Sequence, residues 1–316
     1  MVVERSGGHR AGDGSERPRA VASSGERYVP VGKLELCYET FGDRTMPPLL
    51  LIMGLGSQMV LWEDEFCEQL AQRGFWVVRF DNRDVGRSTI LRESHVPTRS
   101  QLVLRDPRGA AYSLEDMADD AAGLLDQLGV EAAYVVGASM GGMLAQLVTI
   151  RHPARVLSLV SIMATTGNRR VGLTHPALWR QMLRRPRRDR EGYVRDFVES
   201  YRAIGSRRYP SGDDRLCTLA ERCFERGIHP AGTARQLAAV MTATDRTALL
   251  HEIKVATTVI HGDADRLVMP SGGRATAEAV DGARLVVIPG MAHDIPPALW
   301  PQIVGEIEQT AANGRR

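Results

Sequence analysis

The segment that decides the fold is VVGASMGG, at residues 135–142. The apolar run at 132–136 predicts a short buried strand before it, and the apolar residues of 140–151 predict a buried helix after it. Ser139 therefore stands at a sharp turn, where small neighbours two positions away let strand and helix approach each other. Gly137 and Gly141 meet this requirement. The pattern predicts a nucleophilic serine on an elbow; the competing interpretation is an ordinary turn with a glycine-flanked serine.

A serine hydroxyl is a weak nucleophile without a base, so the prediction requires a histidine and an orienting carboxylate. Asp265 lies in HGDAD, after the apolar run that ends at Ile260, and His293 follows the strand-like run 285–288. Because the carboxyl ends of parallel strands meet at one edge of a sheet, Ser139, Asp265 and His293 are expected to gather there.

Two other carboxylates compete with Asp265 for the orienting role, namely Asp263 and Asp294. Asp294 is adjacent to His293 in sequence, which places its side chain poorly for reaching the same imidazole. The orienting acid cannot come from the end of the strand predicted at 156–164, since residues 160–165 carry no carboxylate.

An oxyanion hole is the remaining requirement of acyl-transfer chemistry. The run LLLIMGLG at 49–56 predicts a buried strand that breaks into a glycine-bounded loop, which leaves backbone N–H groups free. We assign the two donors to the amides of Leu55 and Met140. The alternative is an ordinary strand end with no role in an oxyanion hole.

With these motifs in place, the sequence resembles the α/β-hydrolase superfamily from about Tyr28 to about Thr310. Within it, the chain is most similar to serine esterases of the aclacinomycin methylesterase kind. The segments that carry the resemblance are MGLG at 53–56, DEF at 64–66, RFDNRDVGRS at 79–88, GASMG at 137–141, HGDAD at 261–265 and GMAH at 290–293.

The resemblance implies Ser139, Asp265 and His293 as the catalytic triad, and Asp263 departs from the family spacing that Asp265 satisfies. One difference is Met53, where many relatives carry a histidine. Because the oxyanion donor is a backbone amide, this difference does not remove the predicted hole.

Strand and helix patterns alternate along most of the chain, which predicts a mostly parallel sheet with helices on both faces. A hairpin is expected around Gly32, with strands at 28–31 and 34–40. The further predicted strands are 48–53, 75–81, 132–138 and 156–164, and the predicted helices are 59–72, 114–128 and 140–151. The polar loop 81–88 is expected to use its charges to hold itself in place.

The predicted organisation is a disordered tail at 1–26, an α/β-hydrolase core at 27–166 and 253–316, and a helical lid insertion at 167–252. In the insertion the strand rhythm stops and helical periodicity replaces it. An arginine cluster at 184–190 is interpreted as a solvated loop, although docking of an acidic partner stays open. Methionines and tryptophans could line an acyl pocket or fill the core; they are Met163, Met182, Met241, Met291, Trp62 and Trp179.

Composition narrows the class of protein. The chain has 316 residues, 43% of them hydrophobic, and a formal net charge of +2, which does not indicate nucleic-acid binding. The cysteines have no metal-like spacing and are expected to be small buried thiols. No secretory signal or membrane span is seen in the sequence, so a soluble cytoplasmic protein is expected. The oligomeric state is left open.

The predicted activity is hydrolysis of a small apolar carboxylic ester, without a metal or organic cofactor. A thioesterase or lactonase and a carbon–carbon bond hydrolase share these residues and remain alternatives. A non-catalytic small-molecule receptor on the same fold is the alternative from another class.

Overall fold

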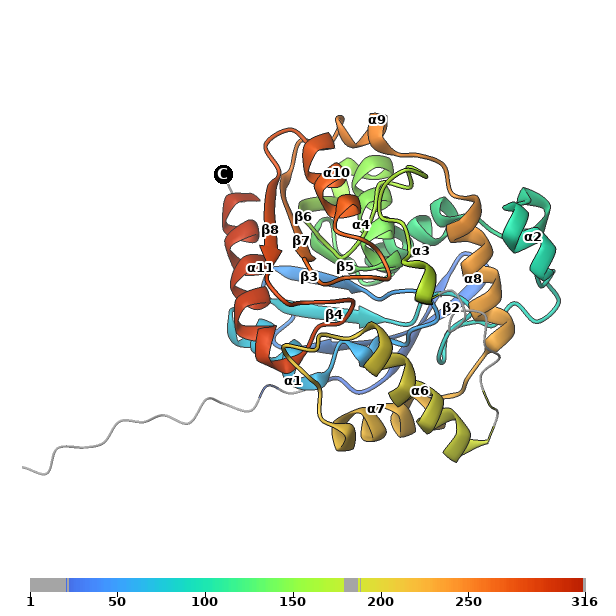
Figure 1. Cartoon of the computed structure of the whole chain (residues 1–316). Helices are drawn as coiled ribbons and strands as arrows, with labels where there is room; N and C mark the ends of the chain where they lie inside the picture. Colours follow the sequence, from blue (N-terminus) through green and yellow to red (C-terminus); the bar gives the residue numbers. More distant parts are fainter. Residues whose placement is uncertain (1–20, 22, 179–186, 188, 315–316) are drawn as a thin grey trace, which may run out of the picture.

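The computed structural model describes residues 21, 23–178, 187 and 189–314. An eight-stranded sheet forms its centre, in the order β1-β2-β4-β3-β5-β6-β7-β8 (Figure 1). The strands β1 and β2 form an antiparallel hairpin, β2 pairs antiparallel with β4, and the remaining pairs are parallel. Their bounds are β1 Arg27–Val31, β2 Leu34–Phe41, β3 Pro48–Ile52, β4 Trp76–Phe80, β5 Ala133–Ala138, β6 Val156–Ile162, β7 Ala256–Gly262 and β8 Arg284–Ile288.

Helices cover both faces of the sheet, because alternate side chains of each central strand point to opposite sides. In β3, Leu50 and Ile52 join the apolar core under α3, α4 and α10, whereas Leu49 and Leu51 join the core under α1 and α11. The bounds are α1 Asp64–Gln72, α2 Arg99–Leu104, α3 Leu114–Gln127, α4 Met140–Arg151, α10 Ser271–Ala279 and α11 Trp300–Gly314. The predicted mostly parallel sheet with two helical layers is confirmed.

The helix predicted at 59–72 is wrong at its start. A short 3-10 turn spans Met59–Leu61, and α1 begins only at Asp64. The carbonyl of Trp62 accepts a hydrogen bond from the buried guanidinium of Arg79, so this carbonyl is directed toward β4. A long-range contact therefore interrupts a segment whose local pattern is helical.

The predicted disordered tail also needs a correction. Residues 1–20 and 22 lie outside the described residues, but Ser23–Glu26 are bonded to the folded domain. Ser23 forms an isolated antiparallel β-bridge with Phe41, and the Ser24 amide donates to the Thr40 carbonyl at 2.9 Å. Glu26 forms an ion pair with Arg226. The predicted boundary at 26 is therefore too late.

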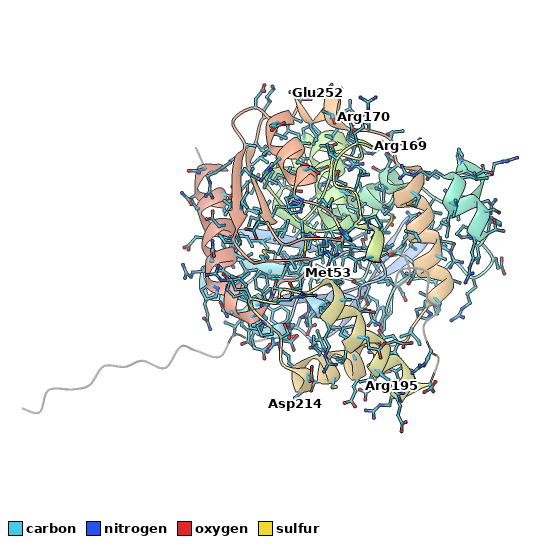
Figure 2. The ribbon with its side chains drawn as sticks, viewed as in Figure 1. Met53, Arg169, Arg170, Arg195, Asp214 and Glu252 are labelled. Carbon is cyan, nitrogen blue, oxygen red and sulfur yellow. The ribbon has the colours of Figure 1, made fainter. Side chains whose placement is uncertain are left out.

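Four helices that lie entirely within the described residues stand between β6 and β7, in the stretch predicted as an insertion (Figure 1, yellow to orange). They are α6 Arg190–Ile204, α7 Asp213–Arg226, α8 Pro230–Thr242 and α9 Thr247–Leu250. In Figure 2, Arg195 of α6 and Asp214 of α7 lie at the periphery of the molecule, whereas Met53 after β3 lies near its centre. No helix in the described ranges is both long and apolar enough to cross a membrane.

Candidate active site

Ser139 occupies the turn between β5 and α4 with a backbone φ of +57°. Non-glycine residues rarely adopt this conformation, and such strain is typical of functional sites. A Cβ at Gly137 would lie 2.0 Å from the Gly141 carbonyl oxygen, and one at Gly141 would lie 2.0 Å from the Ile52 carbonyl oxygen. Both glycines are therefore required by close backbone contacts, and the predicted strand–elbow–helix arrangement is present.

The structure brings Ser139, His293 and Asp265 into one hydrogen-bonded chain. The Nε2 atom of His293 lies 2.9 Å from the Ser139 Oγ, and its Nδ1 lies 2.7 Å from Asp265 Oδ2. The second oxygen of Asp265 accepts hydrogen bonds from the amides of Leu267 and Val268, at 2.8 and 3.0 Å. These amides fix the orientation of the carboxylate toward the imidazole.

Asp265 is buried, and burial by itself raises the pKa of a carboxyl group. The adjacent His293 and His261 more than offset this effect, so the pKa of Asp265 lies well below its usual range. His261 lies near the end of β7, where its Nε2 lies 2.8 Å from the Val268 carbonyl oxygen and 3.4 Å from Asp265 Oδ2. A carboxylate that stays ionised is suited to stabilising an imidazolium.

The two competing acids are bonded elsewhere. Asp263 is exposed, and its Oδ1 accepts a hydrogen bond from the Gly290 amide at 2.6 Å. Asp294 is buried and accepts hydrogen bonds from the backbone N–H and the hydroxyl of Ser206. Burial raises the pKa of Asp294, and the Ser206 hydrogen bonds counteract only part of this effect.

The residues predicted for the oxyanion hole, Leu55 and Met140, both line the cavity that contains Ser139. A Cβ at Gly54 would lie 3.2 Å from the Ser139 Cβ, so the loop after β3 passes directly beside the elbow. Met140 is the first residue of α4, and first-turn amides have no partner within their own helix. Both residues thus lie close to the serine, at the wall of the same cavity.

A cavity of about 480 Å³ opens beside Ser139 and His293. The insertion contributes much of its wall. Its apolar lining includes Leu55, Met143, Met163, Leu216, Leu237 and Met241. Met241 is therefore a pocket residue, and Met163 belongs to both the pocket wall and the core. Trp62 and Met291 belong to the core alone. Trp179 and Met182, the two other candidates for the pocket lining, lie outside the described residues.

Several polar groups also reach this cavity. Arg215 of α7 pairs with Glu63, whose pKa is raised because burial outweighs the effect of the arginine. Arg246 is buried and donates to the Thr165 carbonyl at 2.9 Å, and burial lowers its pKa to about 10. An apolar cavity with a few polar groups is typical of sites for small organic molecules.

The charges of the loop 81–88 do more than hold the loop itself, because they tie the insertion to the core. Asp84 accepts two hydrogen bonds from Arg235 of α8, at 2.7 and 2.6 Å, and Asp81 pairs with Arg226 of α7. All four side chains are buried. No local sequence pattern identifies the two arginines, since their partners lie 145 and 151 positions away.

Cys37, Cys67 and Cys223 are buried free thiols, as predicted, whereas Cys217 is partly exposed. Of the predicted arginine cluster, only Arg187 and Arg190 fall within the described residues. In the described part of the chain, no cluster of three His, Cys, Asp or Glu side chains is arranged to hold a metal ion.

Known esterases are similar to this chain in sequence. The sequence is 28% identical over 307 residues to the rhodomycin D methylesterase DauP of Streptomyces sp. (strain C5), which covers 89% of this chain and 96% of that protein. It is also 26% identical over 275 residues to the bifunctional esterase/perhydrolase DCH of Acinetobacter calcoaceticus, covering 83% of this chain and 91% of that protein.

Solved structures share the fold. The enol-lactonase from Burkholderia xenovorans LB400 superposes with a TM-score of 0.67 at 22% identity, covering 92% of this chain and 99% of that chain. The 2-hydroxy-6-oxo-6-phenylhexa-2,4-dienoate hydrolase from Rhodococcus sp. strain RHA1 gives 0.69 at 18% identity, with coverages of 92% and 99%. The family profile for the alpha/beta hydrolase fold matches residues 47–296, so this chain belongs to the α/β-hydrolase family.

Proposed function

We propose that this protein hydrolyses carboxylic esters through an acyl-serine intermediate. The observation that supports this most is the continuous hydrogen-bonded chain from Ser139 through His293 to Asp265, beside a largely apolar cavity. A serine hydrogen-bonded to a histidine, which is in turn hydrogen-bonded to an aspartate, is the arrangement that activates a hydroxyl for attack on an ester carbonyl.

In the proposed mechanism, His293 Nε2 takes the proton of the Ser139 hydroxyl as Oγ attacks the carbonyl carbon. Asp265 holds the imidazole in the required tautomer and stabilises it when it becomes charged. His293 then gives the proton to the departing alcohol. Water attacks the acyl-serine with His293 again as the base, which returns the free serine and releases the acid.

The amides of Leu55 and Met140 are proposed to stabilise the negative oxygen of the tetrahedral intermediate. Donors aimed at developing charge contribute strongly in a site that excludes water, and removing one such donor typically slows the reaction 10²–10³-fold. Because both donors belong to the backbone, the role does not depend on the side chain at Met53.

The proposed substrate is a small ester, such as a methyl ester, of a bulky apolar acid. The similarity to the Streptomyces methylesterases supports the ester class, and the cavity of about 480 Å³ has room for a bulky apolar group. We also propose that residues 167–252 act as a lid that selects the substrate, since α6, α7 and α8 all contribute to the cavity wall.

The test compares wild-type protein with Ser139→Ala on p-nitrophenyl esters of different chain length, on methyl esters of aromatic acids and on acyl thioesters. Alanine should lower kcat on esters by about 10³-fold or more, because only binding and oxyanion effects remain. Retention of more than a tenth of the wild-type rate would contradict the nucleophile assignment.

A fluorophosphonate probe separates the enzyme from a receptor with the same fold. Labelling of Ser139 without turnover of any ester would favour a non-catalytic receptor. Faster turnover of thioesters than of matched esters would favour the thioesterase alternative.

The lid role is tested with Met241→Ala, which enlarges the cavity and should shift the preferred acyl chain length. Met46→Ala is the matched control, because Met46 is exposed and lies outside the cavity. An unchanged preference in Met241→Ala would contradict the proposed lid.

A further inference from the structure

The loop that carries His293 is bonded to the end of a helix of the insertion. The His293 amide donates to the Ile204 carbonyl at 3.0 Å, and the Ala292 amide donates to Ser206 Oγ at 2.8 Å. The Ser206 amide donates to Asp294 Oδ1 at 2.9 Å, and the Ser206 hydroxyl donates to the same oxygen. Three consecutive residues of the histidine loop are thus held by the turn at 204–206.

This contact is closely packed. Ser206 is 3% exposed. A Cβ at Gly205 would lie 2.5 Å from the Tyr201 carbonyl oxygen and 3.1 Å from Asp294 Oδ2, so the turn and the loop leave no room for a side chain. Further along, the Tyr209 hydroxyl donates to the Pro289 carbonyl at 3.1 Å. The insertion therefore contacts the histidine loop over several residues.

The Ser206 hydroxyl makes two different hydrogen bonds at once. It donates to the Asp294 carboxylate and accepts from the Ala292 amide. A hydroxyl can serve in both ways, whereas alanine can serve in neither. Without the hydroxyl, the buried Ala292 amide has no acceptor and the buried Asp294 carboxylate loses one of its two Ser206 donors. Both losses favour movement of the loop.

We propose that Ser206 is a positioning residue for His293, so that correct seating of the 204–206 turn places the general base. This inference rests on the proposed function, because it concerns the same serine and histidine. Proton transfer requires about 2.6–3.2 Å between the heavy atoms, and a displacement of about 1 Å can cost about 10²-fold in rate. The insertion then shapes the cavity and also sets the distance between His293 Nε2 and Ser139 Oγ.

The kinetic test uses Ser206→Ala, Asp294→Ala and the double variant. Ser206→Ala should lower kcat by about 10- to 100-fold with little change in KM, because it displaces the base without changing the cavity wall. The double variant should be no slower than the slower single variant, since both changes break the same contact. Additive losses would contradict the proposal.

Two variants serve as controls. Asp294→Asn keeps an oxygen that can accept from Ser206 and should retain most of the kcat. Thr218→Ala removes a hydrogen bond to the Asp214 carbonyl on an exposed part of α7, and its kcat should be unchanged. A loss in Thr218→Ala equal to that in Ser206→Ala would show general sensitivity of the insertion and overturn the proposal.

A second measurement does not depend on turnover. The low-field proton resonance of the His293 Nδ1–H bonded to Asp265, assigned by its loss in His293→Ala, should shift or broaden in Ser206→Ala and stay unchanged in Thr218→Ala. An unchanged resonance in folded Ser206→Ala protein would overturn the proposal. If wild-type protein hydrolyses no ester, the proposed function fails, and this resonance still decides whether Ser206 positions His293.

Discussion

Asp265 and His293 are separated by 28 positions in sequence, yet Asp265 Oδ2 lies 2.7 Å from His293 Nδ1. The same carboxylate accepts two backbone hydrogen bonds through Oδ1 and is almost fully buried. Its orientation is therefore decided by the loop after β7 before any substrate binds. This preorganisation is what a base that must keep one tautomer requires.

Asp265→Asn should lower kcat by about 10⁴-fold, because an amide at this position favours the wrong imidazole tautomer. Asp263→Asn is the matched control two residues away. Its exposed side chain needs only one oxygen to accept from the Gly290 amide, so we expect little loss. Steady-state kinetics on a methyl ester compare the two variants. A larger loss of kcat in Asp263→Asn than in Asp265→Asn would identify Asp263 as the orienting acid.

The stability of the protein should depend on pH through Asp265. Its pKa is depressed in the folded state relative to about 3.9 in an unfolded chain, so the folded state binds fewer protons there. The resulting stabilisation is fully present above about pH 4 and is lost as the pH falls toward the folded-state pKa. Urea unfolding of wild type and Asp265→Asn, measured between about pH 2 and pH 6, should give a smaller acid dependence in the variant. An equal pH dependence of the unfolding free energy in the two proteins would contradict the lowered pKa of Asp265.

Gly137→Ala should destabilise the protein by about 3 kcal/mol or more, because its Cβ would lie 2.0 Å from the Gly141 carbonyl oxygen. Gly305→Ala, in α11, is the control. Apart from its chain neighbours and the backbone of its own helix, no atom lies within 4 Å of a Cβ there, and alanine should stabilise the helix by about 0.5–1 kcal/mol. Urea unfolding measures both. Equal effects at the two positions would contradict the close contact in the elbow.

Arg235→Ala should cost about 3–5 kcal/mol of unfolding free energy, because it leaves the buried Asp84 carboxylate without its charged partner. Arg190→Ala removes a half-exposed pair with Glu221 at 3.3 Å and should cost less than about 1 kcal/mol. Chemical denaturation of both variants provides the comparison. A small effect of Arg235→Ala would mean that Asp84 gains another partner or becomes protonated.

Much of the candidate site could be predicted because its signals are local. Spacing of Gly137 and Gly141 around Ser139, together with the apolar runs on either side, indicates a strand, a tight turn and a helix. Chain order then identifies Asp265 and His293 as residues that leave the ends of later strands. The structure places these three side chains in one hydrogen-bonded chain.

Other features could not be read from local patterns. Residues 59–63 have a helical pattern, yet α1 begins only at Asp64, because the Trp62 carbonyl bonds to Arg79 instead of to a helix N–H group. Ser23–Glu26 have the composition of a flexible tail, yet partners on β2 and α7 hold them. In both places, a contact with a distant part of the chain outweighs the local preference.

By itself the sequence determined the sheet with its two helical layers, the strained turn at Ser139 and the order of the three candidate catalytic residues. These follow from periodicity and glycine spacing, which act over a few neighbouring residues. Only the tertiary structure decided how the insertion is attached: through Asp84 with Arg235, and through Ser206 with the His293 loop. Such pairs form where the chain folds back on itself, and their partners are too far apart in sequence for any local pattern to encode.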